Sequence, residues 1–197
     1  MVKTEIWKIS DSGHFTQEDR KHLRGAADII RGGGLVAFPT ETVYGLGANA
    51  LDERAAAKIY EAKGRPSDNP LIAHISSLEE LEPLIARFPE AGRRLAETFW
   101  PGPVTLIFEK SGRVPYGTTG GLKTVAVRMP SDPAAAELIR LSGVPVAAPS
   151  ANLSGRPSPT RAEHVRQDLD GRIDLILDGG PVGIGLESTI VDVTEEI

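Results

Sequence analysis

Residues 16–38, TQEDRKHLRGAADIIRGGGLVAF, decide the fold class. Apolar residues recur on one helical face, and Thr16 and Asp19 have capping-box spacing, so the pattern predicts an amphipathic helix over residues 16–31. Three glycines end the helix, and the short apolar run at residues 35–38 stops at Pro39, which is typical of a buried strand. A helix followed by a buried strand is a building unit of α/β domains.

The same alternation continues along the chain. Helical patterns are expected at residues 52–62, 77–88, 132–143 and from about residue 160, and strand patterns at residues 71–75, 104–108, 124–129, 146–148, 173–177 and 189–193. We therefore expect an α/β fold with a mainly parallel or mixed sheet. No linker divides residues 1–197, so a single domain is expected.

The composition is that of an ordinary globular protein. The 197 residues are 25% charged and 40% hydrophobic, with a net charge of −5, which excludes a disordered chain. The absence of cysteine excludes disulfides, thiolate metal sites and cysteine nucleophiles. No apolar run is long enough for a membrane span or a signal peptide, so a cytoplasmic location is expected. Residues 63–166 carry 13 basic and 10 acidic groups, whereas residues 167–197 carry 1 and 8, so the acidic total conceals a basic central region.

Four segments rich in Gly, Pro and Ser lie near predicted strand ends, where open α/β sheets place ligands. They are PTETVYGLG (39–47), KGRPSDNPL (63–71), PSANLSGRPSPT (149–160) and GGPVGIGLEST (179–189). The fourth is not a P-loop, because Leu186 and Glu187 replace the required lysine and hydroxyl. The first lacks the third glycine of a dinucleotide-binding fingerprint.

The second segment presents cations on a stiff loop. Lys63, Arg65 and Asn69 lie among glycine and two prolines, and an ammonium, a guanidinium fork and an amide suit a polyphosphate. The alternative is helix capping by Lys63 with a solvated Arg65.

The third segment presents Ser150, Asn152 and Ser158 after a strand, a set that suits a phosphate cradle. The alternative is a flexible polar loop. The hydroxyls of the first segment, including Thr42, suit a small polar ligand, and an ordinary capped loop is the alternative there.

Two polar residues interrupt apolar strands. His74 is read first as a hydrogen-bonded core residue, which is the common case for a lone strand histidine. Arg128 needs either a carboxylate partner or an anionic ligand. The four histidines show no metal spacing, and neither a hydrolase triad nor a carboxylate pair stands out. The residues alone favour a site for a nucleotide and a small polar acid.

Six motifs in order resemble the YrdC/Sua5 family, the threonylcarbamoyl-AMP synthases of tRNA modification. They are PTETVYGLG, KGRPSDNPL, WPGPVTLIF (100–108), VAVRMP (125–130), PSANLSGRPSPT and ESTIVD (187–192). The resemblance covers about residues 26–193 and implies an open twisted mixed sheet, flanked by helices, with a concave ligand cavity.

The family's reaction joins L-threonine, bicarbonate and ATP into threonylcarbamoyl-AMP and pyrophosphate, and other proteins then transfer the group to adenosine 37 of tRNA. The resemblance implies a nucleotidyltransferase that takes ATP with Mg²⁺ and needs alignment and charge neutralisation more than a covalent nucleophile. It implies catalytic roles for Lys63 and Arg65. The implied threonine-binding residues are Thr42, His74, Arg128, Ala148 and Ser188. The implied ATP-binding residues are Lys63, Arg65, Asn69, Thr124, Ser150, Asn152 and Ser158.

The chain departs from the family pattern at one point. Family members carry a further basic segment after the ESTIVD strand, and the longer Sua5-type members continue through a linker into a second domain. This chain stops at Ile197, and its KGRPSDNPL segment is similar to that of the longer type, so truncation before the linker is an expectation.

Two other functions stay open at this point. One is a non-catalytic relative that binds double-stranded RNA or tRNA, and weak tRNA binding is compatible with the enzyme as well. The other is a carbamoyl-adenylate domain like that of hydrogenase-maturation proteins, whose accompanying acylphosphatase-like and zinc-finger segments are absent from this sequence. The complete set of threonine and ATP residues favours the synthase.

Overall fold

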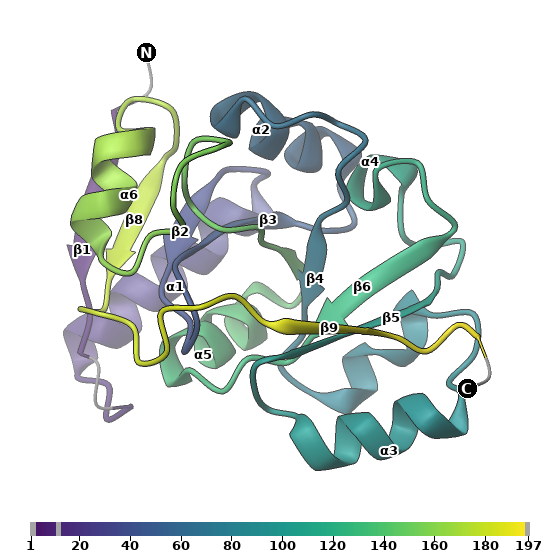
Figure 1. Ribbon diagram of the computed structural model, residues 1–197. Helices are drawn as coiled ribbons and strands as arrows, with labels where there is room; N and C mark the ends of the chain where they lie inside the picture. The colour runs from purple at the N-terminus through teal and green to yellow at the C-terminus, as the bar shows by residue number, and fades with distance from the viewer. Residues whose placement is uncertain (1–2, 11–12, 196–197) are drawn as a thin grey trace.

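The computed structural model describes residues 3–10 and 13–195. Within them, nine strands form one twisted mixed sheet with helices packed on it (Figure 1). The strands are β1 (Glu5–Lys8), β2 (Val36–Phe38), β3 (Gly45–Asn49), β4 (Ile72–His74), β5 (Val104–Glu109), β6 (Thr124–Arg128), β7 (Val146–Ala147), β8 (Leu175–Asp178) and β9 (Thr189–Asp192). Their order is β1-β8-β2-β3-β7-β4-β6-β5-β9, and parallel and antiparallel pairs are equally represented. The expected α/β fold with a mixed sheet is confirmed.

The helices of the described residues are α1 (Gln17–Arg31), α2 (Glu53–Lys63), α3 (Glu90–Phe99), α4 (Tyr116–Thr119), α5 (Pro133–Ser142) and α6 (Ala162–Leu169). Of these, α1, α2, α5 and α6 lie close to where the sequence places them. Thr16 and Asp19 form the predicted capping box of α1. Helix α2 starts after the N-cap Asp52 and ends at Gly64, whose φ of 61° is the left-handed conformation that glycine adopts readily. The capping signals therefore located both ends of α2.

The sheet has a hydrophobic core on each side. In β2, Val36 and Phe38 join a core with α1 and α5, while Ala37 between them joins the other core, with Ile59 of α2. Successive strand residues point to opposite faces, so one short buried strand serves both cores. Burial on both faces explains why residues 35–38 are continuously apolar.

Residues 45–49 form a strand that the sequence did not predict. β3 pairs antiparallel with β2 on one side and with β7 on the other. Gly47 is needed because a Cβ there would lie 2.8 Å from the Phe38 ring and 2.9 Å from a Val146 methyl group. The loop of the PTETVYGLG motif is thus confined to its first half, which turns between β2 and β3.

The helix predicted over residues 77–88 is wrong. Two short 3₁₀ turns, Leu78–Glu80 and Glu82–Leu84, occupy part of this segment, and Ser77 makes no side-chain cap. The Glu80 carboxylate instead accepts hydrogen bonds from the backbone N–H and the hydroxyl of Ser76, at 2.7 and 2.8 Å. Pro83 has no N–H to donate inside a helix, which explains why the chain stops at single turns.

Besides β3, three elements were not predicted: β1, α3 and α4. β1 is a half-polar edge strand that pairs only with β8. Helix α4 is a single turn of four residues, too short for periodicity to be visible. Helix α3 lies below β5 and β9 in Figure 1, and only Gly92 and Ala96 of its residues are buried, so its apolar stripe is narrow.

Candidate functional site

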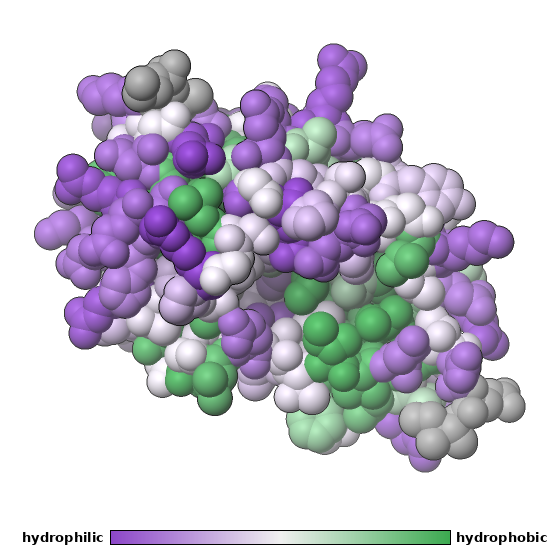
Figure 2. Space-filling model, turned by 45° about the horizontal axis from the view of Figure 1, so that its top comes forward, coloured by the Kyte–Doolittle hydropathy of each residue, from purple (hydrophilic) through white to green (hydrophobic). Residues whose placement is uncertain are grey.

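A cavity of about 300 Å³ lies beside the ends of β4 and β6 and is bordered by the segment that leads into β9. In Figure 1 that segment, shown in yellow, runs across the front of the sheet from β8 towards β9. Figure 2 shows a large patch of hydrophobic residues towards the lower right of the face it depicts, with smaller hydrophobic patches on the left among hydrophilic residues. The cavity is lined by Thr42, Val43, Arg65, Asn69, Pro70, Ile72, His74, Ile107, Ala126, Arg128, Ala148, Pro149, Ser150, Glu187, Ser188 and Ile190.

Strand register brings His74 and Arg128 together. β4 and β6 are parallel, and His74 of the first stands opposite Arg128 of the second. Thr105 of β5 is the antiparallel partner of Arg128, and its hydroxyl lies 2.7 Å from that of Ser188. Three adjacent strands and the start of a fourth therefore place an imidazole, a guanidinium and two hydroxyls at one place in the sheet.

Arg128 is held from three directions. Its side chain is 5% exposed. Its Nε donates to the Gly102 carbonyl at 3.3 Å, and its Nη1 donates to the Thr42 hydroxyl at 3.0 Å. Its Nη2 lies 2.6 Å from Oε1 of Glu41. A buried guanidinium needs a counter-ion, and the ion pair with Glu41 provides the carboxylate partner that was one of the two expectations for Arg128. The guanidinium also lines the cavity, so an anionic ligand can reach it.

His74 is buried and neutral. Burial lowers its pKa to about 3, and the nearby Arg128 charge contributes in the same direction. Its Nδ1 lies 3.1 Å from the Ile72 carbonyl, which assigns the proton to that nitrogen. The ring therefore offers the cavity a neutral polar group and no positive charge.

At the other side of the cavity, Arg65 and Asn69 form a bonded pair. Arg65 Nη2 donates to the Asn69 amide oxygen at 2.6 Å and to the Pro70 carbonyl at 3.1 Å, and Nε donates to the Asn69 carbonyl at 3.2 Å. The loop thus fixes the guanidinium plane beside the cavity. A fixed planar fork is well suited to phosphate oxygens.

Lys63 lies at the end of α2 and is 2% exposed. Its Nζ donates to the carbonyls of Ser150 and Asn152, the second at 2.7 Å, and to the Asn152 amide oxygen at 3.1 Å. Burial is the main reason why its pKa is lowered to about 8, and the positive charge of Arg65 adds to this. Lys63 joins the KGRPSDNPL loop to the PSANLSGRPSPT loop, which helix capping alone does not do.

The PSANLSGRPSPT loop is ordered by its own side chains. The Ser150 hydroxyl donates to the Asn152 amide oxygen at 2.6 Å, and the Asn152 amide nitrogen donates to the carbonyls of Leu153 and Arg156. The Ser158 hydroxyl donates to the Glu187 carboxylate, a contact that lowers the pKa of Glu187. A flexible polar loop would not show these contacts, so that alternative is not supported.

The predicted site residues divide into two groups. Those that line the cavity are Thr42, Arg65, Asn69, His74, Arg128, Ala148, Ser150 and Ser188. Lys63, Thr124, Asn152 and Ser158 do not line it. Lys63 and Asn152 are hydrogen-bonded to Ser150, which does line the cavity. Ser158 is hydrogen-bonded to Glu187, another residue of the lining.

Two carboxylates of this region had no assigned role. Glu41 pairs with Arg128, and Glu187 lies in the cavity lining. Each carboxylate is next in sequence to a residue predicted to bind threonine: Glu41 precedes Thr42, and Glu187 precedes Ser188. This adjacency is the sequence signal that could have identified them. The apolar lining was missed because it is made by strand positions that resemble any core position, such as Ile72 and Ala126.

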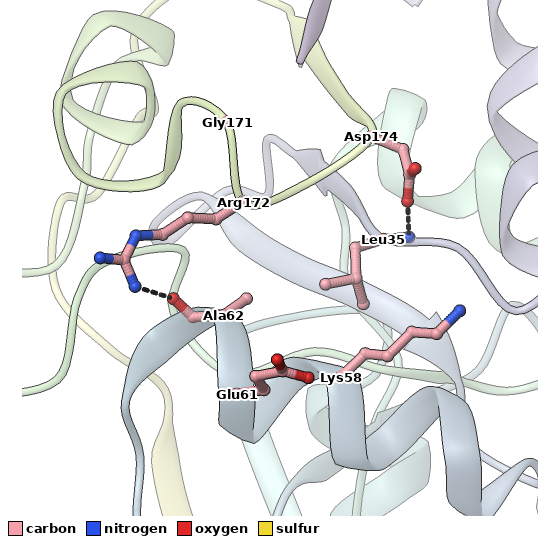
Figure 3. A pocket seen from close by; sticks show the side chains of 7 residues that line it. All are labelled: Leu35, Lys58, Glu61, Ala62, Gly171, Arg172 and Asp174. Atoms are coloured by element: carbon pink, nitrogen blue, oxygen red, sulfur yellow. Dashed lines mark hydrogen bonds between the residues drawn. The ribbon is translucent and has the colours of Figure 1, made fainter. Parts of the chain in front are cut away.

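A second cavity, of about 430 Å³, lies between α2 and the loop before β8 (Figure 3). Three of its polar side chains are engaged with the backbone. Arg172 donates to the Ala62 carbonyl at 3.4 Å, Asp174 accepts from the Leu35 N–H at 2.7 Å, and Lys58 donates to the Gly33 carbonyl at 2.7 Å. These contacts fasten α2 and β2 to the neighbouring loop, so we assign this cavity a structural role.

No helix in residues 3–10 and 13–195 is long and apolar enough to cross a membrane. No group of three or more His, Asp or Glu side chains in the same part of the chain is arranged to hold a metal ion.

Known proteins share both this sequence and this architecture. A threonylcarbamoyl-AMP synthase of Pyrococcus abyssi is 62% identical over 173 residues, which are 88% of this chain and 51% of that protein. The threonylcarbamoyl-AMP synthase of Bacillus subtilis is 54% identical over 197 residues, which are 100% of this chain and 57% of that protein. The chain thus spans about half the length of these curated relatives.

Solved structures agree with the sequence matches. The crystal structure of P. abyssi Sua5 complexed with L-threonine matches with a TM-score of 0.93 and 57% identity, over 98% of this chain and 55% of that one. The crystal structure of Escherichia coli YciO matches with a TM-score of 0.84 and 26% identity, over 100% and 92%. The family model Sua5_yciO_yrdC, described as "Telomere recombination", matches residues 28–197. The site described above is therefore carried by a chain that belongs to the Sua5/YciO/YrdC family.

Proposed function

We propose that this chain joins L-threonine, bicarbonate and ATP into threonylcarbamoyl-AMP and releases pyrophosphate. One observation carries the proposal: a single cavity has a buried guanidinium at one side, Arg128, and a loop-fixed guanidinium at the other, Arg65. A carboxylate and a phosphate are the anions that such groups recognise. The relatives named threonylcarbamoyl-AMP synthase and the relative crystallised with L-threonine support the choice of these two ligands.

The threonine end is the part of the cavity around β4 and β6. Arg128 offers donors for the substrate carboxylate, and the neutral His74 adds no competing charge. The hydroxyls of Thr42 and Ser188 are suited to the polar groups of an amino acid. Apolar residues of the lining, such as Ile72 and Ala126, are suited to the threonine methyl group. Methyl recognition alone separates threonine from serine by only about 1–3 kcal/mol.

The proposed reaction has two steps. The threonine ammonium and bicarbonate give a carbamate, one water and one proton, with a new N–C bond. A carbamate oxygen then attacks the α-phosphorus of ATP, and the bond from that phosphorus to the bridging oxygen of the β-phosphate breaks to release pyrophosphate. Both steps need the reacting groups to be aligned and their charges neutralised, and neither needs a covalent intermediate with the protein.

The nucleotide end is the loop pair fastened by Lys63. Arg65 lies at the cavity, where its charge can offset the charge that develops on the departing pyrophosphate. Lys63 is bonded to Ser150 and Asn152, so we propose that it acts by holding the loop around the phosphates in place. We keep Asn69, Ser150 and Ser158 as proposed nucleotide contacts, with Thr124 at the start of β6 as a further one.

We propose that Mg²⁺ enters as part of the MgATP substrate, because this ion usually keeps several waters and binds through phosphates. The cavity lining includes one carboxylate, Glu187, which is a hard oxygen donor of the kind Mg²⁺ accepts. No step above depends on a protein ligand to the ion. We further propose that the product passes, in the cytoplasm, to proteins that transfer the threonylcarbamoyl group to tRNA.

The test is pyrophosphate release by the 197-residue chain with each substrate omitted in turn. We expect release only when L-threonine, bicarbonate and ATP are all present, with threonylcarbamoyl-AMP detected by mass spectrometry. Release that persists without threonine contradicts the proposal. Tight binding of double-stranded RNA with no release under any condition would favour the non-catalytic alternative.

A further inference from the structure

Glu41 is a buried carboxylate that stands beside the site without lining it. Its side chain is 14% exposed, and its Oε1 lies 2.6 Å from Nη2 of Arg128. The loop that carries it is held on both sides, since the Glu41 carbonyl accepts the Ile184 N–H at 2.9 Å and the next residue, Thr42, donates its N–H to the Thr40 hydroxyl at 3.2 Å. Glu41 therefore occupies a fixed position next to the guanidinium.

The contact between Glu41 and Arg128 is close but is not a well-aligned hydrogen bond. Within the described residues, neither carboxylate oxygen of Glu41 nor Nη2 of Arg128 has a hydrogen-bond partner, although all three atoms are buried. The pair is thus held by charge attraction at short range. The Glu41 carboxylate therefore compensates the Arg128 charge at short range inside the protein.

The other two guanidinium nitrogens do have partners. Nε bonds the Gly102 carbonyl and Nη1 bonds the Thr42 hydroxyl. Both of these acceptors are neutral, so Glu41 supplies the charge compensation that a buried guanidinium needs. Three contacts from two segments of the chain, the loop with Glu41 and Thr42 and the turn at Gly102, fix the plane of the guanidinium.

We propose that Glu41 is a positioning residue, which fixes Arg128 in the orientation that selects a substrate carboxylate. The inference rests on the proposed binding of threonine in this cavity. Glu41 acts through Arg128 and does not touch the substrate. Without its charge, the guanidinium keeps only neutral partners and can turn about its side-chain bonds, so its donors no longer meet a carboxylate at one fixed angle. A bidentate guanidinium–carboxylate contact depends on that angle.

The test compares two ligands, L-threonine and L-threoninamide, which differ only in the charged carboxylate. Calorimetry gives the preference ratio, which is the dissociation constant of L-threoninamide divided by that of L-threonine. It is measured for the wild-type chain and for Glu41→Gln, which preserves the side-chain shape and removes the charge. We expect the preference for threonine over threoninamide to fall at least fivefold in the variant. A general loosening of the fold would weaken both ligands alike and leave the ratio unchanged, and an unchanged or increased ratio overturns the proposal.

Two further variants complete the test. Glu137→Gln removes a comparable but exposed ion pair, with Arg140 at 2.7 Å on α5, and should leave the ratio as in the wild type. If Glu41→Gln does not fold, Glu41→Asp decides the question, because it keeps the charge but shortens the reach to Arg128; a reduced ratio supports the proposal and a wild-type ratio overturns it. If the wild-type chain binds neither ligand, the proposed function itself fails, which is a different result from an unchanged ratio.

Discussion

The Nζ of Lys63 lies 2.7 Å from the carbonyl oxygen of Asn152 and 3.1 Å from its side-chain amide oxygen. This contact joins the end of α2 to the loop after β7, two segments that are 89 residues apart in the chain. Asn152 in turn uses both ends of its amide, accepting from Ser150 and donating to the carbonyls of Leu153 and Arg156. The proposed nucleotide end of the cavity therefore depends on a lysine and an asparagine that do not line it.

The first prediction concerns Asn152→Ala. The substitution removes the acceptor of the Ser150 hydroxyl and one of the three acceptors of Lys63, and it leaves two carbonyls without their donor. Such losses typically cost about 1–3 kcal/mol of unfolding free energy. Because the loop is no longer fixed, we expect ATP affinity to fall at least about tenfold, while L-threonine affinity stays within about twofold, as a tenfold change is about 1.4 kcal/mol. Denaturant unfolding and calorimetry measure the two effects. Ser154→Ala, at an exposed position of the same loop, is the control and should change neither.

A second prediction follows from the pKa of Lys63, which burial lowers to about 8. In the unfolded chain a lysine keeps its proton up to a pKa of about 10.4. Between these values the unfolded state binds more protons, so stability rises with pH. We expect the unfolding free energy of the wild type, measured against Lys63→Met, to increase from pH 7.5 to pH 10.5 by on the order of 1–3 kcal/mol. A difference that stays flat across this range would show that Lys63 keeps its proton when folded.

Much of the architecture could be predicted because its signals are local. The caps of α1, α2 and α5 involve residues within a few positions of the helix ends, and all three helices begin or end as expected. The helix predicted over residues 77–88 was wrong and the strand at residues 45–49 was missed, because tertiary contacts override local patterns. Gly47 suggests a turn, but it is required by packing against Phe38 and Val146.

Part of the cavity lining was also predicted from the sequence. The motifs located Arg65, His74 and Arg128 in the cavity lining, although the residues come from segments far apart in the chain. His74 was first read as a core residue, and it is both buried and part of the lining. The partner of Arg128 could not be deduced, because Glu41 precedes it by 87 residues and only folding brings them to 2.6 Å. Sequence patterns identify such charged residues, but the three-dimensional fold decides which of them pair.

A third prediction concerns acid stability. Burial, with the Arg128 charge, lowers the pKa of His74 to about 3, whereas an unfolded histidine titrates near 6.5. As pH falls below about 6.5 the unfolded state takes up a proton that the folded state does not, so stability is lost with falling pH. We expect the unfolding free energy of the wild type, relative to His74→Asn, to decline between pH 7 and pH 4 by up to about 3 kcal/mol. A difference between wild type and variant that does not change over this pH range would contradict the prediction.

The last prediction separates the two ends of the cavity by substituting one arginine at each. Arg65→Ala removes the fork held by Asn69 and should weaken ATP binding by about 10- to 100-fold, which is about 1.4–2.8 kcal/mol, with little change for L-threonine. For the other end, Arg128→Lys is preferable to Arg128→Ala, because alanine would leave the Glu41 carboxylate buried without a counter-ion. The lysine keeps the charge but cannot form a bidentate contact, so L-threonine binding should weaken at least about tenfold and ATP binding much less.

Calorimetry with each ligand alone measures both variants, and the reverse pattern would mean that the two ends of the cavity have been assigned the wrong way round. Equal losses of both ligands in both variants would mean that the two arginines serve one shared subsite.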